Sequence, residues 1–111
     1  MKTVSIEQFN EIDLRVGKIL KAEYLIDGKY STHKLEIDLG AELGIKKSCA
    51  RLINYKPEEL IGRLIVVVNN FPKKQIGKNI SEVLVLAGPD ENNDAVLLTV
   101  DKSIPLGGRI Y

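Results

Sequence analysis

The sequence is poor in the residues on which most metal-binding, disulfide-bonded and catalytic proteins depend. Its 111 residues include one Cys, one His and no Trp, and aromatic residues make up 5% of the chain. A single Cys excludes an internal disulfide and a cysteine-based zinc cluster, and a single His excludes a multi-histidine metal site. With few aromatic rings and a hydrophobic content of 44%, the core should consist of Val, Leu and Ile.

Signals for export and for membrane insertion are missing as well. The first residues, MKTVSIEQFNEIDLR, carry acidic side chains where a signal peptide needs an uninterrupted apolar core. No apolar run reaches the length of a membrane span. We therefore expect residues 1–111 to form one soluble, unprocessed domain that is cytoplasmic and does not insert into a membrane.

Catalytic motifs are also lacking. The sequence contains no nucleophile elbow, no phosphate-binding P-loop and no dinucleotide fingerprint. His33 is expected on a strand surface rather than as a catalytic base. Cys49 has apolar surroundings that favour a buried, inert thiol, although Lys47 and Arg51 would make it more reactive if it were exposed. We expect a protein that is not an enzyme and that holds no cofactor or metal.

The most apolar stretch that is present is GRLIVVVNNFPKK, residues 62–74. Its β-branched run from Ile65 to Val68 is typical of a strand buried on both faces. Pro72 cannot donate a hydrogen bond to a sheet and should end the strand. Lys73 and Lys74 are then expected to leave the sheet edge into solvent.

Short elements are predicted on either side of this strand. Ser5 and Gln8 have capping-box spacing, which predicts a short helix, and residues 13–26 alternate as a long strand with a bend or bulge near Gly17. Asp27–Gly28 is a turn signal. Further strands are predicted at residues 33–40, 45–53, 81–88 and 95–100, with a short helix at Pro57, a loop at 75–79, and turns at 89–94 and 105–108.

This pattern predicts an all-β or β-rich fold, because no helix is long enough to connect parallel strands. Among small closed folds, a five-stranded OB barrel with short helical insertions fits best. The strands contain more apolar residues than one thin barrel can bury. A homodimer formed through N- and C-terminal extensions is the simplest explanation of the excess.

Charge is distributed unevenly although the net charge is only +1. Residues 46–81 contain eight Lys or Arg and two Glu, whereas residues 82–101 contain five Asp or Glu and no Lys or Arg. This asymmetry favours one basic surface for a ligand. The alternative is that the lysines are solvated and protect strand edges from aggregation. The basic residues concerned are Lys46, Lys47, Arg51, Lys73, Lys74 and Lys78.

Four aromatic residues are candidates for stacking on bases, namely Tyr24, Tyr30, Tyr55 and Phe71. Their positions are more typical of packing in the core or in turns. A nucleic acid would then be recognised through its phosphates and shape, and its affinity would fall steeply as salt rises.

The order of motifs resembles the tRNA-binding domain family. The motifs are IDLRVGKI, HKLEIDLG, YKPEELIGRLIVVVNNFP, SEVLVLAG and PLGG. This family comprises OB-fold modules that occur free-standing, at the C-terminus of methionyl-tRNA synthetases and in related cytokine-like polypeptides. Within it, GIKKSCA, NFPKKQIG and SEVLVL are especially similar to the CsaA group of homodimeric export-related chaperones. Where tRNA-binding members carry Ser-x-Gly-Met, this chain has Ser81 followed by Glu82, Val83 and Leu84, so only Ser81 carries over.

The resemblance implies a CsaA-like chaperone that binds unfolded export precursors, signal peptides or the translocation motor. Exposed strand surface would supply an apolar groove, for which the candidates are Phe71, Pro72, Ile76 and Val83. The alternative for each is a place in the core or in the dimer interface.

A second hypothesis is that the protein binds tRNA by its structure, using a basic surface across the dimer. The candidates for contact with phosphates and sugars are Lys34, Lys46, Lys47, Asn70, Lys73, Lys74, Lys78 and Ser81. A third hypothesis is an accessory module that docks on a larger enzyme, as the synthetase-linked relatives do.

Overall fold

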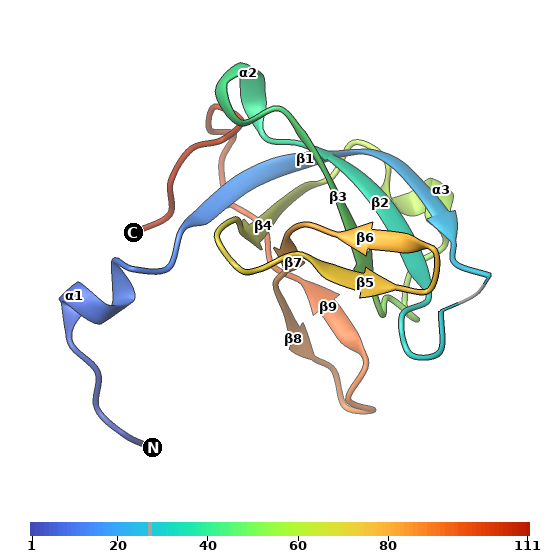
Figure 1. The fold of residues 1–111 in the computed structure, drawn as a ribbon, viewed down its shortest axis with the longest axis horizontal. Helices are drawn as coiled ribbons and strands as arrows, with labels where there is room; N and C mark the ends of the chain where they lie inside the picture. Colours follow the sequence, from blue (N-terminus) through green and yellow to red (C-terminus); the bar gives the residue numbers. More distant parts are fainter. Residues whose placement is uncertain (27) are drawn as a thin grey trace.

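The computed structural model describes residues 1–26 and 28–111 as a small barrel of short strands (Figure 1). Three one-turn helices lie outside the sheet: α1 (Ile6–Phe9), α2 (Gly40–Leu43) and α3 (Pro57–Leu60). The strands are β1 (Leu14–Tyr24), β2 (His33–Asp38), β3 (Ile45–Ala50), β4 (Leu64–Val68), β5 (Lys74–Ile76), β6 (Asn79–Ser81), β7 (Leu84–Val85), β8 (Ala87–Pro89) and β9 (Ala95–Leu97). The predicted turn at Asp27–Gly28 includes a residue outside the described ones.

The main sheet has the strand order β3-β2-β1-β4-β7, and its neighbouring strands are antiparallel. Strand β1 pairs with β4 along its first half and with β2 along its second half, and Lys18 takes part in both ladders. A strand that serves two neighbours in this way must curve, as Figure 1 shows. The result is the nearly closed five-stranded OB barrel that the sequence predicted.

The barrel closes where β3 meets the segment that leads into β7. The backbone N–H of Glu82 donates to the carbonyl of Lys47 at 2.8 Å, and the Ser48 hydroxyl donates to the carbonyl of Val83 at 2.7 Å. Ser48 is buried with this bond made. Because β3 and β7 are the two edges of the sheet, these bonds satisfy edge groups that would otherwise be unpaired.

The barrel interior is aliphatic, as the composition predicted. Alternate residues of β2 face inward, and all four residues from Ile65 to Val68 in β4 are buried, which confirms the expected two-sided burial. The core cluster consists of Ile19, Ala22, Leu35, Ile37, Leu39, Leu52, Leu60, Ile65, Val67 and Val83.

The predicted irregularity in β1 lies elsewhere than at Gly17. The register with β2 shifts between Ile19 and Lys21, further along the strand. Gly17 has a different role, because a Cβ atom there would lie 2.6 Å from Cγ2 of Ile37 and 2.7 Å from Cδ2 of Leu39. Because Gly17 has no side chain, Ile37 of β2 and Leu39 just beyond it can pack directly over the Gly17 backbone.

The segment after the central strand also differs from the prediction. Residues 75–79 were expected to form a loop, but Lys74–Ile76 and Asn79–Ser81 pair as the β5–β6 hairpin. The predicted strand at 81–88 is divided into β7, which pairs with β4, and β8, which pairs with β9. The Leu86 backbone N–H still donates to the Val66 carbonyl of β4 at 3.0 Å, and from Ala87 the chain pairs with β9 instead.

His33 is buried in the core, so the prediction of a strand-surface histidine is wrong. Its side chain lies on the inward face of β2 and is 1% exposed. Nε2 lies 3.0 Å from the Tyr55 carbonyl, which can only accept, so the Thr32 hydroxyl 2.7 Å from Nδ1 is the donor to the neutral ring. Burial lowers the pKa of His33, and the hydrogen bond to Tyr55 offsets part of that shift.

The N-terminal segment projects from the barrel on the side where the C-terminus ends (Figure 1). Helix α1 has the predicted capping box, with Ser5 and Gln8 each accepting from the other's backbone N–H, but none of its residues is buried. Val4 and Ile6 are 63% and 66% exposed. This extension therefore carries apolar surface that its own barrel leaves uncovered.

The close packing over Gly17 leads to a stability prediction. In the Gly17→Ala variant the added methyl group overlaps Ile37 and Leu39, so we expect the free energy of unfolding to fall by about 1–3 kcal/mol. Gly88 lies in β8, where an added methyl group would meet no atom within 4 Å, so Gly88→Ala is the matched control. Denaturant unfolding should leave Gly88→Ala near the wild type, and equal stability of the two variants would contradict the packing account.

Candidate functional site

An apolar groove lies beside β7, between the loop after β4 and the start of the β8–β9 hairpin. Phe71, Pro72, Ile76 and Val83, the residues predicted to form a peptide site, all line it. We call this surface the apolar groove. Its lining residues are Tyr30, Ser31, Cys49, Ala50, Arg51, Leu52, Phe71, Pro72, Lys74, Ile76, Ser81, Glu82, Val83, Leu84, Val85, Ala87 and Ala95.

The four predicted groove residues differ in how much surface they present. Phe71 is 46% exposed, Pro72 is exposed and Ile76 is half-buried. Val83 is only 4% exposed and belongs to the core cluster. The structure thus places Phe71, Pro72 and Ile76 on the walls of the groove, whereas Val83 supports its floor.

Two basic residues line the apolar groove. The Arg51 guanidinium lies 5.0 Å from the centre of the Tyr30 ring, and its Nη1 donates to the Tyr30 carbonyl at 3.2 Å. Lys74 is exposed at the start of β5. An extended apolar ligand in this groove would therefore have positive charge beside it.

A second hollow lies on the outer face of β1, β2 and β3. Its charges alternate in sign: Lys34 pairs with Glu23 at 3.3 Å, and Lys21 lies 3.9 Å from Glu36. Each member is at least 38% exposed, so these pairs contribute little to stability. We call this surface the charged hollow, and its lining residues are Lys21, Glu23, Lys34, Leu35, Glu36, Lys47, Ser48, Cys49, Asn79 and Ile80.

The start of β3 and the loop after Pro72, which both carry basic residues of the predicted surface, meet at Glu82. Its Oε1 accepts a hydrogen bond from the Lys47 backbone N–H at 2.9 Å, and its Oε2 lies 3.6 Å from Nζ of Lys73. The N–H of Lys47, followed by the charges of Lys73 and Lys46, holds the pKa of Glu82 below its ordinary value, although partial burial opposes the shift. The start of β3 and the loop after Pro72 therefore face one ionised carboxylate.

Two of the predicted RNA-contact residues have their side chains engaged within the fold. Asn70 accepts from the Asp13 backbone N–H at 2.8 Å and donates to the Glu11 carbonyl at 2.7 Å. The Ser81 hydroxyl accepts from the Cys49 backbone N–H at 3.0 Å. Lys78 is exposed in the turn of the β5–β6 hairpin. The sequence alone offered no signal for these internal bonds, and a role of these residues in binding stays a prediction.

Most of the candidate stacking aromatics pack against other side chains. The Tyr24 ring lies 5.0 Å from the His33 ring, and Arg63 lies 5.1 Å from the centre of the Tyr55 ring. The Tyr55 hydroxyl also accepts from the Leu97 backbone N–H at 3.1 Å. Phe71 is the candidate that faces the apolar groove without a ring or cation contact among the described residues.

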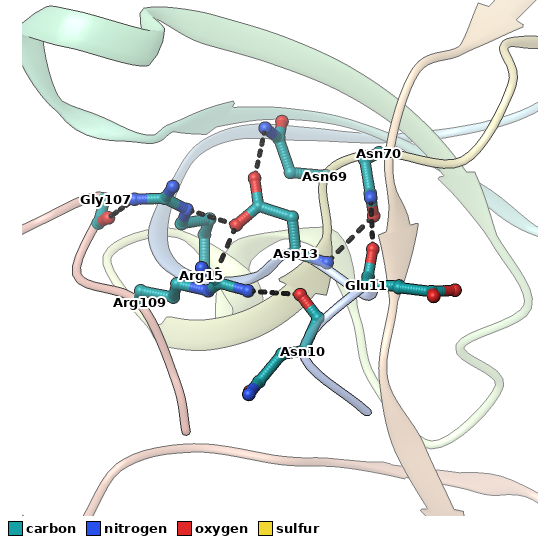
Figure 2. Close-up of polar contacts among 8 residues, drawn as sticks. All are labelled: Asn10, Glu11, Asp13, Arg15, Asn69, Asn70, Gly107 and Arg109. Carbon is teal, nitrogen blue, oxygen red and sulfur yellow. Dashed lines mark hydrogen bonds and ion pairs between the residues drawn. The ribbon is translucent and has the colours of Figure 1, made fainter. Parts of the chain in front are cut away.

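A polar cluster that no sequence pattern indicates holds the loop before Phe71 in place (Figure 2). Asp13 accepts from Nε of Arg15 at 2.7 Å and from Nδ2 of Asn69 at 3.0 Å. Arg109 lies 3.8 Å from the same carboxylate and donates to the Asn10 carbonyl at 2.7 Å. We call this cluster the polar latch.

The polar latch joins three distant parts of the chain, because the residue before β1, the end of β4 and the C-terminal segment meet at Asp13 (Figure 2). Burial alone would raise the pKa of Asp13, but hydrogen bonds from Asn69 and Arg15 and the charges of Arg15 and Arg109 outweigh it and lower that pKa. Asn69 and Asn70 directly precede Phe71. The latch therefore sets the position from which the groove wall begins.

Metal-binding clusters and membrane-spanning helices are both missing from the described part of the chain. Among residues 1–26 and 28–111, no three His, Cys, Asp or Glu side chains are placed so that they could hold a metal ion. In the same residues, no helix is both long and apolar enough to cross a membrane.

Comparison with known proteins decides the family. A family model described as "Putative tRNA binding domain" matches residues 14–109, which include every strand from β1 to β9. The chain belongs to the tRNA-binding domain family. The resemblance seen in the motifs is thereby confirmed.

Solved structures of CsaA chaperones share the fold of this tRNA-binding domain. The chaperone CsaA of Bacillus anthracis is 42% identical, with a TM-score of 0.90 over 99% of this chain and 100% of that one. The CsaA chaperone protein of Picrophilus torridus is 39% identical, with a TM-score of 0.91 over 98% of this chain and 100% of that one. These neighbours are chaperones rather than catalytic domains.

Methionine–tRNA ligases contain a similar segment. The ligase of Methanothrix thermoacetophila is 42% identical over 104 residues, which are 94% of this chain but only 15% of the ligase. The chain thus spans about a sixth of the length of the ligases it matches. The similarity concerns one tRNA-binding-type domain of a much longer enzyme.

The polar latch leads to a prediction that depends on pH. In Asp13→Ala, Arg15 and Asn69 lose their acceptor, so we expect the free energy of unfolding to fall by about 1–2 kcal/mol at pH 7. Because the folded-state pKa of Asp13 lies below its ordinary value of 3.8, its contribution is complete above that pH and is lost as the pH falls further. Denaturant unfolding between pH 3 and 7 should show the deficit shrinking at the acid end.

The control for the latch is Asp101→Ala, which removes an exposed carboxylate that makes no hydrogen bond or ion pair with the described residues. Its stability should equal that of the wild type at every pH. A deficit in Asp13→Ala that persists unchanged down to pH 3 would contradict an electrostatic role for the latch.

Proposed function

We propose that this protein is a non-enzymatic, CsaA-like chaperone that binds extended apolar segments of unfolded export precursors or signal peptides. One observation carries the proposal: Phe71, Pro72 and Ile76 form the walls of an open apolar groove directly above the core. The similarity to CsaA chaperones along almost the whole chain supports it. The translocation motor is a second partner under the same proposal.

The chemistry of the groove suits an unfolded client. Aliphatic and aromatic side chains gain about 25 cal/mol for each Å² of apolar surface that a ligand covers, whatever the ligand's sequence. Lys74 and Arg51 add positive charge at the rim, where they favour clients that carry acidic residues beside the apolar segment. Binding of this kind is broad in specificity, as a chaperone requires.

The proposed assembly is a homodimer that forms through the terminal extensions. Val4 and Ile6 are more than 60% exposed, and Tyr111 at the other terminus is fully exposed. A twofold contact between these segments would cover apolar surface that one barrel leaves open. Under this proposal the protein acts in the cytoplasm, before its client proteins are exported.

Structure-selective binding of tRNA is the second candidate function. It is supported by the family model and by the lysines that gather around Glu82 and the charged hollow. Lys34 and Lys47 line the charged hollow, Lys74 lines the apolar groove, and Lys73 lies 3.6 Å from Glu82, which also lines that groove. On a dimer these residues would occur twice, which doubles the positive surface available to one RNA.

The chaperone proposal predicts a loss of peptide binding in Ile76→Ser. Removing this apolar side chain from the groove wall should cost about 1–2 kcal/mol of binding, a roughly five- to thirtyfold rise in Kd for an unfolded precursor peptide. Fluorescence anisotropy with a labelled peptide measures it. Ile80→Ser, in the same hairpin but outside the groove, is the matched control and should bind as the wild type does. Equal affinity of both variants would exclude this groove.

The tRNA candidate predicts that charge reversal at Lys73 and Lys74 weakens binding of all tRNAs alike. Each lost phosphate contact should reduce the slope of log K against log salt by about 1. A titration of bulk tRNA at several salt concentrations measures both quantities. Reversal at Lys2 and Lys102, which line neither surface, makes the same change in net charge and should have a much smaller effect. If both double variants behave alike, the basic surface is not the RNA site.

A further inference from the structure

We propose that Glu82 is a specificity-determining residue that disfavours nucleic acid on this surface relative to polypeptide. Its fixed carboxylate neutralises the lysines that a phosphate backbone would contact. This inference rests on the proposed function, because it concerns which of the two candidate ligands that surface accepts.

The backbone around Glu82 is held rigidly against β3. The N–H of Glu82 donates to the Lys47 carbonyl at 2.8 Å, and the N–H of Lys47 donates back to Oε1 of Glu82 at 2.9 Å. The neighbouring residues Ser81 and Val83 are tied to the same strand through Cys49 and Ser48. The carboxylate is thus part of the barrel closure, which holds it beside β3.

The second carboxylate oxygen of Glu82, Oε2, faces Lys73. Oε2 lies 3.6 Å from Nζ of Lys73, and the Glu82 side chain is 21% exposed whereas that of Lys73 is 69% exposed. The pKa of Glu82 is lowered first by the Lys47 N–H and then by Lys73 and Lys46, so the group is ionised at neutral pH. A flexible lysine therefore lies beside a fixed negative charge.

This arrangement affects the two candidate ligands differently. A phosphate that approaches Lys73 must displace or share the lysine's bond with Glu82 and is itself repelled by the carboxylate. Each phosphate contact that is lost lowers the affinity for the nucleic acid, because that affinity depends on the number of phosphates that are neutralised. A neutral apolar peptide in the groove, by contrast, gains its affinity from Phe71 and Ile76 and has no negative charge for the carboxylate to repel.

Replacing Glu82 with Gln tests the inference without opening the barrel. Glu82→Gln keeps an oxygen that can accept from the Lys47 N–H but removes the charge. Glu91→Gln, in the exposed turn between β8 and β9, changes the net charge equally and is the matched control. The probes are bulk tRNA at several salt concentrations and a neutral apolar peptide, and unfolding curves check that both variants are folded.

We expect Glu82→Gln to raise tRNA affinity roughly three- to tenfold at low salt and to steepen the salt slope by about 1. Glu91→Gln should change tRNA affinity less than about twofold and should leave peptide binding unchanged. Because Glu82 also lines the apolar groove, Glu82→Gln should change the affinity for the neutral peptide less than it changes the affinity for tRNA. A gain of tRNA binding by Glu82→Gln from an undetectable wild-type level also supports the inference. A response of Glu82→Gln no larger than that of Glu91→Gln overturns it.

A second test leaves Glu82 in place. Lys73 is paired with the carboxylate, whereas Lys74 makes no ion pair with the described residues. Lys74→Gln should therefore weaken tRNA binding at least threefold more than Lys73→Gln in the wild type, and this difference should disappear in the Glu82→Gln background. Equal losses in the wild type would overturn the inference.

The same data separate this inference from the proposed function. If the wild type does not bind the peptide, the chaperone proposal fails, yet a selective rise in tRNA affinity in Glu82→Gln still supports the role of Glu82. If the wild type binds the peptide but Glu82→Gln and Glu91→Gln bind tRNA alike, the role of Glu82 is wrong and the chaperone proposal stands.

Discussion

The structure depends on one continuous strand that serves two neighbours. The eleven residues of β1 pair with β4 along one half and with β2 along the other, so the sheet must bend until its edges meet. Gly17 allows core side chains to pack against this curved strand, because Ile37 and Leu39 lie directly over its backbone. The closure between β3 and the segment at Glu82 follows from that bend. The apolar groove and the charged hollow, the two candidate ligand surfaces, lie beside this closure.

Closure of the barrel and the proposed recognition of a ligand therefore involve the same residues. Val83 completes the core while its neighbours Ser81 and Glu82 join β3, and the side chains on either side of this segment line the apolar groove. The polar latch plays a comparable part at the other end, because Asn69 and Asn70 hold the loop that begins the groove wall. A change in either region would alter stability and binding together, so experiments need variants that keep the hydrogen bonds and change one property.

Family membership does not choose between the two proposed ligands, polypeptide and tRNA. Segments of long methionine–tRNA ligases and complete CsaA chaperones resemble the chain equally well, at 42% identity in each case. A fold can be shared by modules with different ligands, because the barrel specifies only where strands and loops lie. The choice depends on the local balance of apolar surface and charge, and in this chain Glu82 lies where the two surfaces meet.

By itself the sequence determined the β-rich fold class, the aliphatic core and the two-sided burial of Ile65–Val68, because alternation and β-branched runs are local signals. The order of its motifs determined the family. The same alternation places His33 with Leu35 and Ile37 on the inward face of β2, so the burial of His33 also follows from a local signal. Only the tertiary structure decided that Asn70 bonds the backbone of Glu11 and Asp13 and that Val83 is core. It also decided that the Lys47 backbone N–H and the Lys73 ammonium group face one carboxylate. The bonds from Asp13 to Asn70 and from Lys47 to Glu82 join residues 57 and 35 positions apart, and no local pattern encodes which distant side chains barrel closure will bring together.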